Sequence, residues 1–360
     1  MRKFLFTFLL FVSPFIIWLF INFFFVPADL FAFRSWEALQ PKLFFSYFSG
    51  PFYPNMKLQK VEVGDLAPHT ALAVDKEVFW QTDRYGYRTS DDSEDYDIVI
   101  VGDSNTVGTG LTQADTPAAV LARLSGRHVY PYATADISRF LGEERFQKHK
   151  PQVVILSSIE RSLTGLCADI RIAEKAPKNS LSYISKIIGS NRPVDTLVSR
   201  LDRSLAPGNF KHLYYKLTRT VPPPLYTYMS GKMLFLQGTT ANRDLSAGEI
   251  NKIADNIENC NKLLAARDIR MIFLPIPNKE NIYYRLLPEQ KKPTLLKNLL
   301  AELAARGMEV VNLETPFLAA HEREGTALYH TDDTHWNAMG VKLAAEKLAD
   351  YLESDLRVSL

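Results

Sequence analysis

Short apolar runs typical of buried strands alternate with longer amphipathic stretches typical of helices along most of the chain after residue 95. The expected strands cover residues 98–101, 129–132, 153–156, 271–274 and 310–312. The expected helices cover residues 116–125, 247–267, 292–306 and 338–352. This order predicts an α/β fold in which helices cover a parallel sheet.

The alternation stops between residues 162 and 246. Helical fragments there surround three consecutive prolines, 222–224, and an apolar run, 233–236. We therefore expect one domain at residues 96–355 with a helical insertion at about 162–246. Residues 27–95 are expected to form a juxtamembrane segment and the entrance to this domain.

Residues 1–26 combine a short basic tip with an apolar stretch that is long enough, as a helix, to cross a bilayer. Arg2 and Lys3 precede residues 4–26, which contain no charged residue. The positive-inside rule places the N-terminus in the cytoplasm and the rest of the chain outside. A cleaved signal peptide is the alternative, but the stretch lacks a small-x-small cleavage motif. We favour an uncleaved transmembrane anchor.

Composition narrows the possible functions. The 360 residues are 46% hydrophobic and 23% charged, as is typical of a folded protein with a sizeable core. The net charge of +2 and the absence of a long basic run give no indication of a nucleic-acid partner. Cys167 and Cys260 would face an oxidising compartment, either as a disulfide or as two separate buried thiols.

Two motifs far apart in the sequence supply the residue types of a serine nucleophile and its base. Ser104 follows the strand expected at 98–101, within Gly102-Asp103-Ser104. Near the C-terminus, Asp332, Asp333 and His335 provide two carboxylates and an imidazole. A serine hydroxyl becomes a good nucleophile when a base takes its proton, and a carboxylate orients that base. We predict Ser104 as nucleophile, His335 as base, and Asp332 or Asp333 as the orienting acid.

A strand followed by Gly102-Asp103-Ser104, with Asp-x-x-His before the last helix, resembles the SGNH (GDSL) superfamily of esterases and acyltransferases. The resemblance extends to the branch of alginate O-acetylation proteins through Gly86-Tyr87-Arg88, Glu160-Arg161, residues 275–279 and Asp333-Thr334-His335-Trp336. It covers roughly residues 80–350 and implies a three-layer, flavodoxin-like SGNH domain with a parallel sheet, preceded by one N-terminal transmembrane helix.

The resemblance bears on the two aspartates. Asp-x-x-His in most of the superfamily points to Asp332, whereas Asp-Thr-His-Trp in the alginate branch points to Asp333, which we favour. Alginate O-acetylation proteins place Asp-Thr-His before the serine. Here Ser104 comes first, so the chain follows the more common order of the superfamily.

The glycine and asparagine that usually complete the oxyanion hole of this superfamily are not cleanly present. The backbone amides of Thr134 and Ala135 and the side chain of Arg161 are therefore the candidate oxyanion or substrate contacts. The alternative for Arg161 is a structural ion pair with Glu160.

A metal site is the competing interpretation of the C-terminal motif, because His330, Asp332, Asp333 and His335 are all metal-compatible ligands. We prefer the serine triad, which also accounts for Ser104, and expect no metal and no cofactor.

The other residues of these motifs have structural interpretations. Trp336 is expected to pack and Asn337 to cap the last helix. We expect Lys279 to be solvated and Arg88 to bind backbone carbonyls.

Together the anchor and the resemblance imply a bacterial inner-membrane, single-pass protein with its catalytic domain in the periplasm or outside. The implied activity is transfer or removal of an acyl group, acetyl in the first instance, on an envelope or exported polysaccharide through a serine acyl-enzyme. A membrane-embedded acyl-donor partner is implied by analogy. The alternative is a catalytically degenerate SGNH domain that binds glycan or scaffolds a polysaccharide-modification complex.

Overall fold

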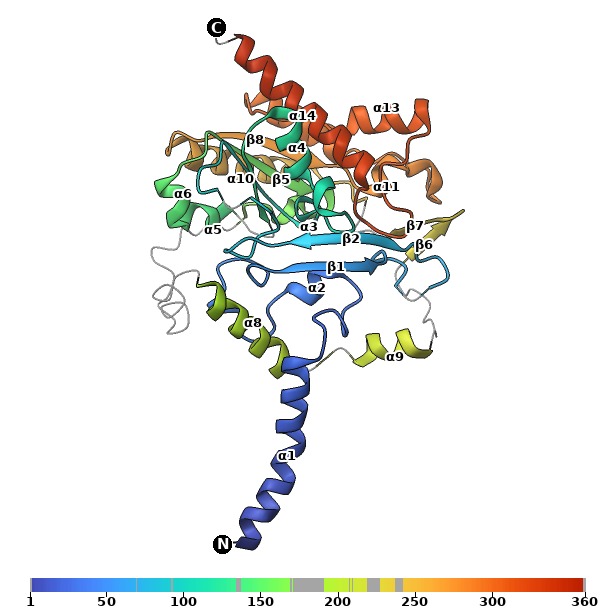
Figure 1. The fold of residues 1–360 in the computed structure, drawn as a ribbon. Coiled ribbons are helices and arrows are strands. Elements are labelled where there is room, and N and C mark those ends of the chain that lie inside the picture. Colours follow the sequence, from blue (N-terminus) through green and yellow to red (C-terminus); the bar gives the residue numbers. More distant parts are fainter. Residues whose placement is uncertain are drawn as a thin grey trace.

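The computed structural model describes residues 2–68, 70–91, 93–133, 137–168, 170, 191–206, 208, 210–218, 227–236 and 242–358. A long N-terminal helix, α1 (Arg2–Phe24), projects from the body of the molecule (Figure 1). None of its residues is buried, and it is long and apolar enough to cross a membrane.

A parallel four-stranded sheet with the order β4-β3-β5-β8 forms the centre of the body. Its strands are β3 (Ile98–Gly102), β4 (Val129–Ala133), β5 (Val153–Ile159) and β8 (Arg270–Ile276). Ile98 pairs with Val129 on one side and with Val153 on the other. The strands are buried on both faces, which explains why they read as continuous apolar runs. The predicted α/β class is confirmed.

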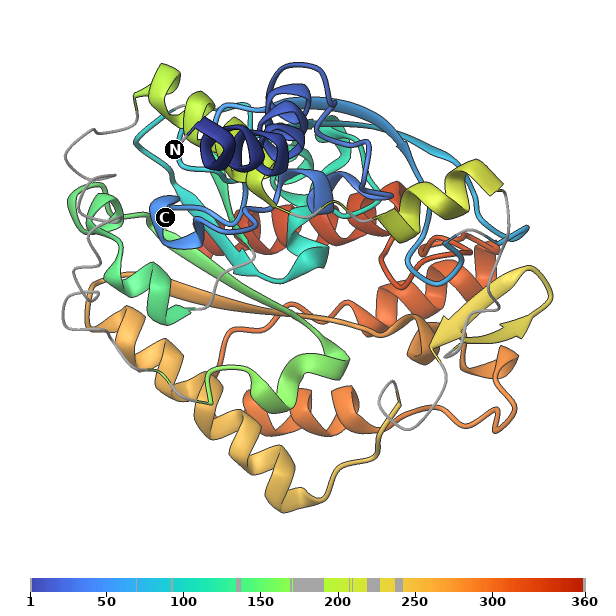
Figure 2. The ribbon, with the colours of Figure 1, turned by 90° about the horizontal axis from the view of Figure 1, so that it is seen from below.

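Helices cover both faces of the sheet and give three layers (Figures 1 and 2). Ile98 and Ile100 of β3 pack into a cluster that includes side chains of α4 (Pro117–Ser125) and α14 (Ala338–Val358). The alternate residues Val99 and Val101 belong to a second cluster, which includes side chains of α10 (Ala247–Ala265) and α12 (Leu295–Ala305). Successive side chains of one strand therefore fill the two cores on opposite faces.

Two expected elements differ from the sequence prediction. The strand expected at 310–312 is wrong, because Val310 forms only an isolated bridge to Phe273. The chain turns there into α13 (Glu314–Glu324), whose N-cap is Leu313, and Asn312 Oδ1 accepts a hydrogen bond from the amide of Glu314 at 2.9 Å. The helix expected from residue 292 begins only at Leu295.

The segment between α1 and the sheet domain forms a separate layer in Figure 1. It contains α2 (Ser35–Leu39), η1 (Phe45–Tyr47), β1 (Lys57–Glu62) and β2 (Lys76–Gln81), the two strands pairing antiparallel. Buried Arg88 donates hydrogen bonds to the carbonyl oxygens of Gly108 and Leu111 at 2.5 and 2.6 Å. Its predicted role of binding backbone carbonyls is confirmed.

The remaining elements lie between these strands and helices. They are α3 (Ser104–Val107), η2 (Gln113–Asp115), α5 (Ile137–Gly142), α6 (Glu144–Lys148), η3 (Glu160–Gly165), α8 (Arg192–Leu205), α9 (Phe210–Thr218), β6 (Thr227–Ser230), β7 (Met233–Leu236), α11 (Lys279–Ile282) and η4 (Tyr284–Leu286). The expected insertion at 162–246 contains α8, α9 and the antiparallel β6-β7 pair. We retain the boundaries at residues 26, 95 and 355 as a proposal.

Cys167 and Cys260 form a disulfide across 93 residues of sequence. The bond joins the chain just after η3 to α10. Of the two alternatives left open by the sequence, the structure therefore contains the bonded one.

Replacing both cysteines by serine should lower the free energy of unfolding by about 2–4 kcal/mol, because the unfolded chain regains the freedom that the long closed loop removes. Thermal unfolding of the full chain with and without reductant measures this effect. Reductant should lower the melting temperature of the natural protein towards that of the double variant and leave the variant unchanged. Equal melting temperatures for the natural protein and the double variant, both measured without reductant, would contradict the prediction.

Candidate active site

Ser104 lies at the start of α3, directly after the carboxyl end of β3. Asp103 shapes this turn, since its Oδ1 accepts a hydrogen bond from the amide of Asn105 and its Oδ2 one from the amide of Ile159, both at 2.8 Å. Gly102 leaves no room for a side chain, because a Cβ there would lie 2.2 Å from Thr106 Oγ1. The Gly-Asp-Ser sequence therefore builds a tight turn that presents the partly exposed Ser104.

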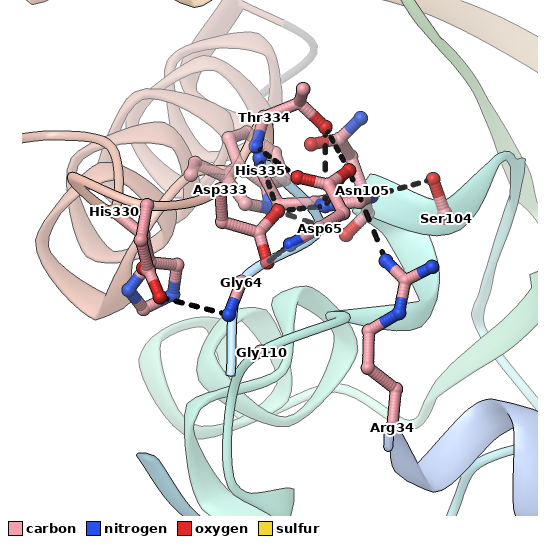
Figure 3. Close-up of polar contacts among 12 residues, drawn as sticks. Arg34, Gly64, Asp65, Ser104, Asn105, Gly110, His330, Asp333, Thr334 and His335 are labelled. Carbon is pink, nitrogen blue, oxygen red and sulfur yellow. Dashed lines mark hydrogen bonds and ion pairs between the residues drawn. The ribbon is translucent and has the colours of Figure 1, made fainter. Parts of the chain in front are cut away.

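His335 connects Ser104 to Asp333 (Figure 3). Its Nε2 lies 2.8 Å from Ser104 Oγ, and its Nδ1 lies 2.6 Å from Asp333 Oδ1. A carboxylate only accepts hydrogen bonds, so Nδ1 donates its proton to Asp333 and Nε2 is left to accept from the serine hydroxyl. The three side chains thus have the geometry of a nucleophile, a base and an orienting acid.

The structure distinguishes the two adjacent aspartates by their partners. Asp332 points away from the imidazole, and its Oδ1 binds Lys76 Nζ at 2.7 Å. Its Oδ2 accepts from the amides of Gly64 and Val74, both at 2.8 Å. Asp332 is thus placed in a buried ion pair, and Asp333 is the aspartate next to His335.

Asp65, from the loop after β1, adds a second carboxylate that the sequence analysis missed (Figure 3). It accepts hydrogen bonds from the amide and the hydroxyl of Thr334 at 2.8 and 2.6 Å. One of its oxygens lies 3.8 Å from His335 Nδ1, and its amide donates to Asp333 Oδ2 at 3.2 Å. No sequence signal marks a Gly-Asp pair 268 residues from Asp333 as part of the site.

Two neighbours of Asp65 extend the site towards the N-terminus. A Cβ on Gly64 would lie 2.0 Å from the carbonyl oxygen of Asp332, so glycine allows the two loops to approach. On the other side, Arg34 places a guanidinium nitrogen 3.9 Å from Asp65 Oδ2 and stacks over the ring of Trp36. The segment that follows α1 therefore reaches the candidate catalytic residues directly.

Lys279 holds the loop that carries Asp333 and His335. It is fully buried, so the expectation of a solvated lysine was wrong. Its ammonium group donates to the carbonyl oxygens of His330, Thr331 and Asp333 at 2.6, 3.1 and 3.1 Å. Burial lowers the pKa of Lys279 to about 8. The charge is offset by carbonyl dipoles and by nearby carboxylates, so its role here is to position the loop.

Burial and the neighbouring charges have opposite effects on the pKa of His335. Burial disfavours the charged ring, but the carboxylates of Asp333 and Asp65 outweigh it and raise the pKa of His335 above its ordinary value. Burial would likewise raise the pKa of Asp333, but the charge and hydrogen bond of His335 hold it well below its usual range. Burial raises the pKa of Asp65, and the neighbouring charge of Asp333 adds to the effect. Asp333 is therefore the carboxylate that stays ionised beside the ring.

Arg161 lies beside the triad, whereas the two other oxyanion candidates cannot be placed. Its Nη2 is 3.5 Å from Thr334 Oγ1, and its buried Nη1 has no hydrogen-bond partner among the described residues. Glu160 accepts instead from the amide of Asn278 at 2.9 Å and from the side chain of Asn281 at 3.0 Å. These contacts do not support the alternative of an ion pair between Glu160 and Arg161. Thr134 and Ala135 lie outside the described residues.

The four residues considered as metal ligands do not converge. Asp332 is bound to Lys76, and His330 is a partly buried residue beside Gly110, where desolvation of the ring lowers its pKa to about 4. Asp65, Asp333 and His335 do bring ligand atoms within 4.8 Å of one another. Because Nδ1 and Nε2 of His335 already face Asp333 and Ser104, this group matches proton transfer better than cation binding.

The residues that follow His335 confirm their predicted structural roles. Trp336 is buried, and its indole nitrogen donates to the carbonyl oxygen of Asn105 at 3.2 Å. Asn337 caps α14, since its Oδ1 accepts from the amides of Met339 and Gly340 at 2.9 and 3.1 Å.

Comparison with known proteins identifies the C-terminal part of the chain. Residues 232–359 match the family model described as the SGNH hydrolase-like domain of the acetyltransferase AlgX. This match confirms the predicted SGNH resemblance; its range includes Asp333 and His335 and excludes Ser104. No sequence among the curated proteins matches the chain.

Asp333→Asn should slow covalent labelling of Ser104 by a fluorophosphonate roughly thousandfold or more, because a side-chain amide does not orient the imidazole as a carboxylate does. Asp332→Asn, the matched control, should retain most of the labelling rate. It should instead lower the free energy of unfolding by about 3 kcal/mol, because Lys76 loses its buried charged partner. A greater loss of labelling in Asp332→Asn than in Asp333→Asn would overturn this assignment.

The charge of Asp65 should affect how fluorophosphonate labelling of Ser104 depends on pH. His335 accepts a proton only when neutral, so reactivity of Ser104 falls as the pH drops through the raised pKa of His335. Asp65→Asn removes one of the groups that raise this pKa, so labelling of the variant should persist to a lower pH than labelling of the natural protein. Asp268→Asn, at an exposed carboxylate, should leave the profile in place. If labelling of Asp65→Asn is lost at the same pH as labelling of the natural protein, or at a higher pH, the role of Asp65 is contradicted.

Proposed function

We propose that this protein is a membrane-anchored, extracytoplasmic serine acyltransferase that moves an acyl group, most simply acetyl, onto an envelope or exported polysaccharide. The observation that carries the proposal is the hydrogen-bonded chain from Ser104 through His335 to Asp333. The match to the SGNH hydrolase-like domain of an acetyltransferase supports acyl transfer or hydrolysis on a polysaccharide.

The reaction would proceed in two steps on Ser104. His335 Nε2 takes the hydroxyl proton while Ser104 Oγ attacks the carbonyl carbon of an ester donor. The tetrahedral intermediate collapses to the acyl-enzyme, and the protonated imidazole returns the proton to the departing oxygen. A hydroxyl of the acceptor then loses its proton to His335 and attacks the acyl carbon. The bond between that carbon and Ser104 Oγ breaks, and the imidazolium returns the proton to Oγ, which restores the serine. Throughout, ionised Asp333 accepts a hydrogen bond from His335 Nδ1–H and stabilises the imidazolium that each step creates.

Arg161 is the group we assign to the oxyanion. Within the part of the chain that the structure describes, its buried Nη1 has no hydrogen-bond partner, and its Nη2 reaches Thr334, the residue next to His335. A donor that is already fixed and dehydrated stabilises developing negative charge without further reorganisation. The amide of Ser104 is a second donor, since the first residues of a helix have no acceptor within it. Arg161 would thus take the role of the asparagine that this chain lacks.

Two features support a proposed compartment, α1 and the disulfide. Arg2 and Lys3 precede the apolar helix, which by the positive-inside rule favours a cytoplasmic N-terminus and a body outside the cytoplasm. The Cys167–Cys260 bond is consistent with an oxidising compartment. We therefore propose a single-pass inner-membrane protein with the catalytic domain in the periplasm. Acetyl donors originate in the cytoplasm, so a membrane-embedded partner would have to supply the acyl group.

Ser104→Ala should abolish both fluorophosphonate labelling and acetyl-ester turnover by the full-length protein. Ser354→Ala, an exposed serine of α14, should retain both and serves as the matched control. Adding a carbohydrate acceptor should divert acetyl groups from water to sugar hydroxyls, as followed by mass spectrometry of the glycan. Hydrolysis that no acceptor diverts would exclude transferase activity. Labelling and turnover that persist in Ser104→Ala would exclude the serine mechanism, and their absence from the natural protein would favour the degenerate, glycan-binding alternative.

A further inference from the structure

The surface helix α8 buries polar side chains and exposes apolar ones, which is the reverse of the usual arrangement. Its buried residues are polar and comprise Asp195, Ser199, Asp202 and Ser204. Its large apolar residues face outwards: Leu197, Leu201 and Leu205 are 56, 36 and 46% exposed. These three leucines recur every four residues and form one stripe along the helix. A helix that packs on a protein core normally turns such a stripe inwards.

Buried hydrogen bonds fix this orientation. Asp202 accepts from the amides of Lys42, Leu43 and Phe44 at 2.7, 2.8 and 2.7 Å. It also accepts from the hydroxyl of Tyr53 at 2.6 Å. Turning the leucines inwards would leave these donors without their partner, and each buried donor left unpaired destabilises the fold. The outward stripe is thus built into the packing of α8.

The neighbouring helix α9 repeats the pattern. Phe210, Tyr214 and Leu217 are 54, 56 and 74% exposed. Their spacing of four and three residues places them on one face of the helix. We refer to the exposed apolar residues of α8 and α9 together as the anchor-side surface; it comprises Leu197, Leu201, Leu205, Phe210, Tyr214 and Leu217.

The anchor-side surface adjoins α1. The ring of Phe210 lies 6.1 Å from that of Trp18 in α1 and 5.2 Å from that of Phe31. Trp18 precedes the end of α1 by about 9 Å at the helical rise of 1.5 Å per residue. Figures 1 and 2 show α8 and α9 on either side of α1, on the side of the body from which it emerges. The surface is therefore continuous with the last turns of the apolar helix.

We propose that the anchor-side surface inserts into the headgroup and upper acyl region of the bilayer around α1. This inference rests on the proposed membrane anchoring of α1. Exposed Arg200, next to Leu201 in the sequence, and exposed Arg192, the first residue of α8, suit anionic lipid headgroups. The body is then held against the membrane by two helices in addition to α1. Because Arg34 and Asp65 link this side of the molecule to the triad, Ser104 is held at a fixed height above the bilayer.

Site-directed fluorescence in the full-length protein tests this surface. Both natural cysteines are bonded, so a single introduced cysteine can be labelled selectively. Leu201→Cys and Leu217→Cys probe the surface, Phe11→Cys probes α1, and Leu124→Cys, 40% exposed on α4, is the aqueous control. Each bimane-labelled protein is reconstituted into vesicles of phosphatidylethanolamine and phosphatidylglycerol. Quenching is measured with doxyl-labelled lipid and with aqueous iodide.

Labels at 201 and 217 should be quenched by the lipid probe and shielded from iodide, whereas the label at 124 should show the reverse. If the labels at 201 and 217 are quenched by iodide and not by the lipid probe, while the label at 11 is quenched by lipid, then the surface proposal is wrong but membrane anchoring by α1 is supported. Shielding from both quenchers would indicate a protein partner and overturn the assignment to lipid. A label at 11 that lipid does not quench would remove the anchor itself, and the surface proposal with it.

Discussion

The buried hydrogen bond between His335 and Asp333 is the interaction on which the site depends. It fixes the imidazole so that Nε2 faces Ser104, and it determines which nitrogen carries the proton. The loop that makes this bond is held from three directions, by Lys279 at its carbonyl oxygens, by Lys76 through Asp332, and by Asp65 through Thr334. Each restraint is a charged group placed where water is largely excluded, so its strength comes from complete pairing.

These restraints make the segment after α1 a structural part of the site. Asp65 and Gly64 follow β1, and Arg34 precedes α2, yet all three lie against the loop of Asp333 and His335 or against each other. A segment that the sequence presents as a connection between anchor and domain thus supplies one of the carboxylates that raise the pKa of His335. Under the proposed topology, the reacting serine is coupled to the membrane through a short chain of polar contacts.

Local sequence patterns predicted the sheet and pointed to Ser104, Asp333 and His335, which the structure brings together, but they did not predict the groups around them. Apolar runs and Gly-Asp-Ser are encoded within a few residues, and the strands that include Ile98 and Val153 were located from them. The contact of Asp65 with Thr334 joins residues 269 positions apart and has no local signal. Lys279 was misjudged because composition cannot reveal three carbonyl oxygens that converge on a buried ammonium group. Val310 was misjudged because α13 begins at Glu314, with Asn312 bonded to its first amide, which leaves little chain for a longer strand.

The central claim is that an acyl group passes through Ser104. Rapid quenching of the full-length protein during turnover of an acetyl ester, followed by mass spectrometry of its peptides, measures this directly. We expect an acetyl group on the peptide that contains Ser104, localised to that serine and removed when a carbohydrate acceptor is added. Turnover at an undiminished rate with no adduct on Ser104, or with the adduct on another residue, would contradict it.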